Sequence, residues 1–278
     1  MVLNDQLRSE MRRLDFRGNL IVDRDNPVLV QKALRDRFSA PGHWKAGYGG
    51  EAYLSRPHSE DALTWNVFRS LQMMGPQGLM IIQAVFGLST VQNILFWGCD
   101  VESRSEPQQY LNCLIRGIDG RHRGTMTEPD LVVISDAEVA FVECKLNANG
   151  RESPWKAQGS GAEKRFRTYV NECGFKELEE IPTWEPMYQF IRQYVYARRL
   201  AELLDRRPLV FALIREEHVT SWGATYQPLR AFNPGIFRPF VTWQAIRNAL
   251  AGTGDDRVAA KIVDGIDKAL GSASKECQ

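Results

Sequence analysis

Two acidic residues and one lysine fall at the ends of two neighbouring apolar segments of this 278-residue sequence. Asp130 opens the segment 130–134, and Glu143 and Lys145 close the segment 139–145. Two adjacent carboxylates repel each other unless a cation compensates their charge. A divalent cation held by both would lower the pKa of a bound water molecule and neutralise the oxygens of a phosphate, and a neighbouring ammonium would orient the attacking water. These residue types therefore indicate hydrolysis of a phosphodiester bond.

The turn between the two segments sets their register. With a loop of two residues (136–137) or of four (135–138), Ile134 lies opposite Val139, and the same register places Asp130 opposite Glu143. Opposite residues point to one face of a sheet with Cβ atoms roughly 5 Å apart, and Lys145, two residues beyond Glu143, projects from that face as well. We expect the two carboxylates to share one small hard cation, with the carbonyl of Cys144 as a further ligand.

The flanking sequence predicts the elements that carry these residues. A cap and a helix-starting proline open a helix from about residue 27 to 38, and Ser59 caps a second helix that has Glu60 in its first turn. Runs of β-branched and aromatic residues predict strands at 110–115, 131–134 and 139–145. An amphipathic helix over 185–206 then leads to a strand at 209–214. The order is helix, three strands, helix, strand, which indicates an α+β fold.

This combination resembles the PD-(D/E)XK nuclease superfamily, with Pro129-Asp130 in place of its PD and Glu143-Cys144-Lys145 in place of its (D/E)XK. The resemblance implies a restriction-endonuclease-like core over about residues 59–215, with a central mixed sheet flanked by helices in an α/β sandwich. Residues 1–58 and 216–278 would then be elaborations of a single domain. It also implies that Asp130 and Glu143 bind Mg²⁺, that Mn²⁺ substitutes for it, and that Lys145 assists the water. In that family an acidic residue on the preceding helix often joins the metal, and Glu60 is its match.

Some branches of the family place a glutamine in the helix after the motif, followed by tyrosine four residues later. Gln189 and Gln193 both lie in the predicted helix 185–206, with Tyr194 and Tyr196 close by, but neither has a tyrosine at that spacing. We assign Gln189 to the catalytic site and keep Gln193 as the alternative for the same position.

The sequence thus predicts a magnesium-dependent endonuclease acting on DNA. Two alternatives of other kinds stay open: a noncatalytic nucleic-acid- or protein-binding module on the same fold, and a nuclease directed at RNA. A surface hairpin with a cross-strand ion pair would also account for the three residues. The net charge is +1, so any surface that binds nucleic acid must be local. Two groups of basic residues are candidates for phosphate contact or simply for solvation: Arg116, Arg121, His122 and Arg123, and Lys156, Lys164, Arg165 and Arg167.

Other features narrow the class of protein. The five cysteines are scattered without a C-x-x-C pair, and the four histidines show no metal-ligand spacing, so neither a zinc site nor a disulfide framework is indicated. No apolar run suits a signal peptide or a membrane span, which predicts a cytoplasmic protein with no membrane partner. A homodimer is compatible with the sequence.

Overall fold

The computed structural model describes residues 19, 22–37, 54, 59–102, 105–118, 128–146, 160–181, 184–253 and 257–276. The chain divides into two compact units. The first comprises Met1–Ile82 and Ile246–Gln278, and the second comprises Gln83–Ala245. The predicted core over residues 59–215 therefore draws on both units.

The first unit is helical in its described part. It contains α2 (Pro27–Arg37), α3 (Glu60–Met73) and α11 (Arg257–Glu276), and α11 packs against α3. The hydroxyl of Ser59 accepts a hydrogen bond from the backbone N–H of Ala62 at 3.1 Å, which confirms the predicted cap of α3. α4 (Pro76–Phe86) begins in this unit and ends in the second, and α10 (Trp243–Ala251) does the reverse.

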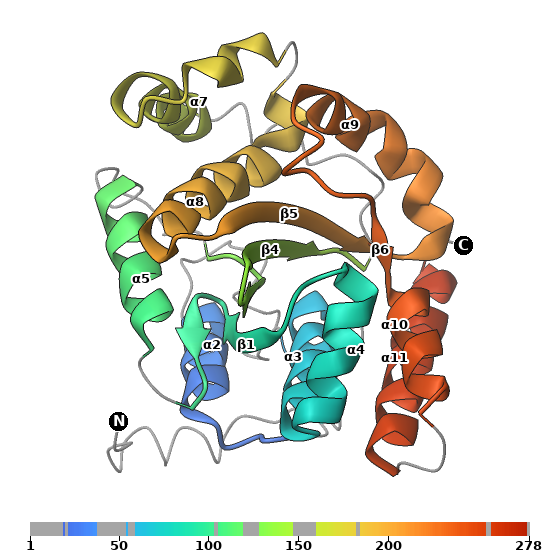
Figure 1. Cartoon of the computed structure of the whole chain (residues 1–278). Helices are drawn as coiled ribbons and strands as arrows, with labels where there is room; N and C mark the ends of the chain where they lie inside the picture. The colour runs from blue at the N-terminus through green and yellow to red at the C-terminus, as the bar shows by residue number, and fades with distance from the viewer. Residues whose placement is uncertain are drawn as a thin grey trace. The chain divides into compact units, whose positions relative to one another are not determined.

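The second unit is built on a six-stranded mixed sheet of strand order β2-β1-β3-β4-β5-β6 (Figure 1). The strands are β1 (Val91–Phe96), β2 (Cys99–Asp100), β3 (Leu131–Ser135), β4 (Glu138–Cys144), β5 (Arg207–Ile214) and β6 (Val241–Thr242). The first four in sheet order pair antiparallel, whereas β4, β5 and β6 pair in parallel. The sheet with its helices confirms the α+β class.

The β3–β4 hairpin has the register that the sequence predicts. Ile134 lies opposite Val139 and Leu131 lies opposite Val142, across a loop of two residues, 136 and 137. Glu138 belongs to β4 and is buried. Its carboxylate accepts hydrogen bonds from the hydroxyls of Ser135 and Ser89, each at 2.7 Å, and these compensate the cost of burial.

The predicted strand at 110–115 is wrong. These residues belong to α5 (Glu106–Ile118), whose buried residues Leu111, Ile115 and Ile118 recur at intervals of four and three. That spacing marks one face of a helix, and its period outweighs the β-propensity of the individual residues. The sequence missed three strands, β1 and the two-residue strands β2 and β6. In β1 a shift of register between Val91 and Asn93 interrupts the alternation of buried and exposed side chains.

The crossover from β4 to β5 contains the helix that matters for the site. After α7 (Ser160–Arg167), a π-helical turn (Thr168–Glu172) and the short helices Lys176–Glu180 and Glu185–Met187, α8 (Tyr188–Leu204) packs against β4 and β5 (Figure 1). α5 packs in turn against α8. The short helix Glu216–His218 and α9 (Val219–Phe232) follow β5.

A shared core fixes α8 on the sheet. It includes alternate residues of the strands, which leave the same face, and apolar residues of α8: Val132, Ile134, Val139, Phe141, Val210, Phe190, Ile191, Tyr194, Val195 and Ala197. None of the helices within the described ranges is long and apolar enough to cross a membrane.

Candidate active site

Asp130 and Glu143 lie at the same end of the β3–β4 hairpin. The paired residues of the two strands end at Leu131 and Val142, and Asp130 and Glu143 are the next residues along the chain, so the same register carried one step further would set them opposite each other. Alternation from Phe141 puts the side chain of Glu143 on the face of the sheet that α8 covers. The Asp130 carboxylate accepts a hydrogen bond from the backbone N–H of Cys144 at 2.8 Å, and its own carbonyl accepts one from the N–H of Trp97 at 3.2 Å. Asp130 is therefore held by both neighbouring strands before any ligand arrives.

Lys145 forms an ion pair with Glu143. Its Nζ lies 2.6 Å from Oε1 of Glu143, with side-chain exposures of 14% for Lys145 and 4% for Glu143. The backbone of Lys145 is fixed as well, since its N–H donates to the carbonyl of Leu213 at 2.8 Å and its carbonyl accepts from the indole of Trp243 at 3.2 Å. The ammonium is thus positioned rather than free to sample solvent.

A glutamine from α8 completes the group. The amide nitrogen of Gln193 donates to Oε2 of Glu143, and its Oε1 has no hydrogen-bond partner in the part of the chain that the structure describes. Gln193 is fully buried, whereas Gln189, one turn earlier, is only half-buried. The position assigned first to Gln189 is filled by its alternative, Gln193. The structure thus brings together Asp130, Glu143, Lys145 and Gln193, which we call the carboxylate cluster.

The donor atoms of the carboxylate cluster suit a magnesium ion. Mg²⁺ takes oxygen ligands, is commonly bound through one or two carboxylates, and keeps several waters. The buried Oε1 of Gln193 is an oxygen without a donor, and such an atom is costly unless a cation or a water meets it. Within the described ranges no three His, Cys, Asp or Glu side chains gather into a metal-binding group. A cation here would therefore rest on two carboxylates, with amide, backbone or water oxygens in addition.

The two remaining predicted ligands are Glu60 and the carbonyl of Cys144. Glu60 lies in the first turn of α3, in the first unit, whereas the carboxylate cluster lies in the second. Asp61, beside Glu60, is buried and pairs with Lys32 at 2.9 Å. The side chain of Cys144 is fully buried and alternates to the other face of β4 from Glu143, and its backbone N–H makes the contact with Asp130.

One charged residue at this place was not expected from the sequence. Arg192, next to Gln193 on α8, is 3% exposed. Gln189, Arg192, Gln193 and Tyr196 recur at the i, i+3, i+4, i+7 spacing of one helix face. Such a polar face ordinarily meets solvent, so the spacing alone does not reveal that Arg192 and Gln193 are buried.

The structure describes four of the basic residues proposed for phosphate contact. Arg116 is exposed in the last turn of α5, and Arg121, His122, Arg123 and Lys156 lie outside the described residues. On α7, Lys164 is exposed, Arg165 is half-buried, and Arg167 pairs with Glu163 at 3.2 Å.

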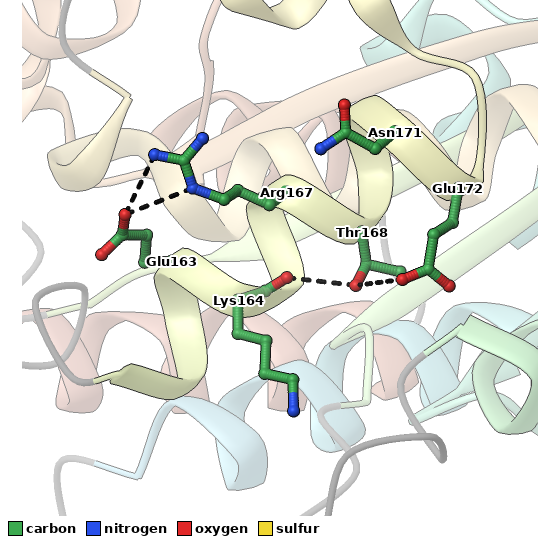
Figure 2. A pocket seen from close by; sticks show the side chains of 6 residues that line it. All are labelled: Glu163, Lys164, Arg167, Thr168, Asn171 and Glu172. Carbon is green, nitrogen blue, oxygen red and sulfur yellow. Dashed lines mark hydrogen bonds and ion pairs between the residues drawn. The ribbon is translucent and has the colours of Figure 1, made fainter.

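A pocket of about 380 Å³ opens over α7 and the π-helical turn (Figure 2). Its lining is Glu163, Lys164, Arg167, Thr168, Asn171 and Glu172. Within it Arg167 turns to Glu163, and the Thr168 hydroxyl donates to the carbonyl of Lys164 at 3.1 Å. The pocket shares no residue with the carboxylate cluster, and its charges are of both signs.

No family model, no curated protein and no solved structure matches this chain. The carboxylate cluster and its Pro129-Asp130 and Glu143-Cys144-Lys145 motif are therefore the features from which a function can be inferred.

Proposed function

We propose that this chain is a magnesium-dependent nuclease that hydrolyses phosphodiester bonds of DNA, with Mn²⁺ able to replace Mg²⁺. The observation that carries the proposal is the gathering of these side chains at one end of the hairpin: the carboxylate of Asp130 accepts from the N–H of Cys144, the residue after Glu143, and Nζ of Lys145 lies 2.6 Å from Glu143. The three residues correspond to the acidic pair and the lysine of the PD-(D/E)XK pattern.

The strand arrangement supports the same proposal. An antiparallel run β1-β3-β4, a crossover through α8 and a parallel β5 are compatible with a restriction-endonuclease-like core. In that arrangement the acidic pair lies where β3 begins and β4 ends, and α8 faces it through Gln193.

Each residue of the carboxylate cluster has a role in this chemistry. Asp130, Glu143 and Oε1 of Gln193 would hold the cation, which supplies positive charge to the phosphate and lowers the pKa of a water. Lys145 would orient that water and offset the negative charge that develops on the phosphate. The hydrogen bond from Cys144 keeps Asp130 in place, so little reorganisation is needed at the moment of reaction. The carbonyl of Cys144 is proposed as a further ligand.

The test is a cleavage assay on four substrates: supercoiled plasmid, linear duplex, single-stranded DNA and RNA, each with Mg²⁺, Mn²⁺ or EDTA. We expect cutting of DNA that requires the metal and is lost in Asp130→Asn, Glu143→Gln and Lys145→Met. Asp136→Asn, an acidic residue at the other end of the same hairpin, is the matched control and should cut normally.

Other results would overturn the proposal. Cutting that persists in the three variants would place the chemistry elsewhere. Binding of DNA without cutting, unchanged by the substitutions, would indicate a noncatalytic module. Cutting of RNA alone would show that the substrate is RNA and not DNA. The metal chemistry itself does not distinguish the two nucleic acids.

A further inference from the structure

Arg192 is a buried cation on α8 beside the carboxylate cluster. Its guanidinium carbon lies 5.9 Å from the centre of the Tyr188 ring, and only 3% of the residue is exposed. Across the described parts of the chain, no carboxylate forms an ion pair with it and no group accepts a hydrogen bond from it. A buried charge is costly unless a partner compensates it, so a guanidinium in this state requires an explanation.

Tyrosine side chains surround Arg192. The hydroxyls of Tyr169 and Tyr188 lie 3.3 Å apart and their rings are stacked. Burial lowers the pKa of Arg192, but the electrostatic influence of the oxygens of Tyr188, Tyr169 and Tyr196 and of Glu143 outweighs burial and raises that pKa. The group stays charged, and neutral hydroxyls offer dipoles to it rather than a countercharge.

The charges around the carboxylate cluster indicate that an anion would supply the countercharge of Arg192. Asp130 and Glu143 bring two negative charges, and Lys145 and Arg192 bring two positive charges. A divalent cation among them leaves an excess of positive charge, which an anion would offset. Arginine presents paired N–H donors in a plane, a geometry that matches two oxygens of a phosphate.

We propose that Arg192 binds a backbone phosphate of nucleic acid beside the carboxylate cluster. The assignment of the phosphate to nucleic acid rests on the proposed nuclease function. The binding of a phosphate oxyanion by Arg192 is independent of that function. The sequence neighbour Gln193 contacts Glu143, so the helix that presents the guanidinium is also tied to the acidic pair.

The first experiment measures thermal unfolding without metal, in sodium phosphate and in sodium chloride at equal ionic strength. The variants are Arg192→Met and Arg192→Lys. Arg198→Met is the matched control, because Arg198 lies on the same helix and already pairs with Glu177 at 2.9 Å.

We expect phosphate to raise the Tm of the wild type and of Arg198→Met above the value in chloride. In Arg192→Met this gain should vanish, and in chloride its Tm should equal or exceed that of the wild type, because an uncompensated charge has been removed.

The opposite pattern would overturn the proposal. An arginine that serves only to pack on Tyr188 predicts a lower Tm for Arg192→Met in chloride and an unchanged response to phosphate. Absence of any phosphate effect on the wild type would also count against an oxyanion site at Arg192.

A second experiment separates this inference from the nuclease itself. Binding of a fluorescent duplex oligonucleotide in EDTA should weaken about tenfold in Arg192→Met, less in Arg192→Lys, and little in Arg198→Met. If Arg192 governs phosphate and oligonucleotide binding while no metal-dependent cutting occurs, the nuclease fails and the anion site stands. If the wild type and Arg192→Met bind and cut equally well, the anion site fails and the nuclease stands.

Discussion

The side-chain amide of Gln193 donates a hydrogen bond to the carboxylate of Glu143, across 50 residues of sequence. This contact joins the crossover helix α8 to the strand that carries the acidic motif. Glu143 is thereby held from two sides, by Gln193 at Oε2 and by Lys145 at Oε1. The properties of the carboxylate cluster consequently depend on α8 as much as on the hairpin.

Gln193→Ala should reduce cleavage and weaken metal binding, since it removes both the donor to Glu143 and the buried amide oxygen. Loss of a group that orients a metal ligand typically costs about 10- to 100-fold in affinity or activity. The measurement is the initial rate of plasmid cleavage across a Mg²⁺ titration. Gln189→Ala, one turn earlier and half-buried, is the control. A larger defect in Gln189→Ala than in Gln193→Ala would reverse the assignment of the two glutamines.

Lys145→Met should destabilise the protein by about 3 to 5 kcal/mol, because it leaves the buried carboxylate of Glu143 without its cationic partner. The double variant Lys145→Met with Glu143→Gln should regain most of this loss, since it removes the unpaired charge as well. Urea unfolding followed by circular dichroism gives both values, and neither protein should cut DNA. Equal stability of the single and double variants would show that the ion pair contributes little.

Glu60→Gln and Asp61→Asn should separate a metal role from a structural one. Asp61 pairs with Lys32 in a buried setting, so Asp61→Asn should lower the Tm by removing that buried ion pair. Glu60→Gln should leave the Tm nearly unchanged, and its Mg²⁺ titration tests the ligand role that the sequence resemblance implies for Glu60. A normal Mg²⁺ titration for Glu60→Gln would remove Glu60 from the predicted ligands.

Glu138 should make the fold sensitive to acid. Burial raises the pKa of Glu138, but hydrogen bonds from Ser135, Ser89 and Arg207 outweigh it and lower the pKa from 4.5 to about 2. Because the pKa of Glu138 is lower in the folded state, its contribution is complete above pH 4.5 and is lost as the pH falls toward 2. That contribution is on the order of 3 kcal/mol.

The comparison protein is Glu138→Gln, unfolded by urea at intervals between pH 7 and pH 2. The wild type should be the more stable at neutral pH, and the difference between the two proteins should shrink through the window from pH 4.5 to 2. A difference that stays constant over that window would mean that the titration of Glu138 does not limit stability.

Local rules were enough to predict the hairpin and its register. A turn between two apolar strands allows only registers that keep one face buried, so the opposition of Ile134 and Val139 follows from sequence. The same holds for the Ser59 cap of α3, which needs only neighbouring residues. The predicted strand begins at Val139 and omits Glu138, because the burial of Glu138 depends on Ser89, 49 residues earlier.

Long-range packing explains what the sequence did not reveal. The segment at 110–115 carries β-formers, and only its packing as α5 against α8 determines that it is a helix. Gln193 is fully buried against Glu143 and Gln189 only half-buried because of the rotation of α8 on the sheet, which no local pattern specifies. Arg192 was overlooked for a related reason: an arginine in an amphipathic helix normally faces solvent, and its burial emerges only in the folded chain.

The parallel pairing of β4 with β5 has a consequence for newly made protein. The hairpin needs only neighbouring residues, but Glu138 finds its strand partner Arg207 after 69 further residues, and Gln193 must arrive with α8 in between. As synthesis proceeds, a growing polypeptide on the ribosome can form the acidic hairpin while it still lacks α8 and β5. Under the proposed nuclease function, such an unfinished chain would not yet cut nucleic acid, because Gln193 and Leu213, the partners of Glu143 and Lys145, are still missing.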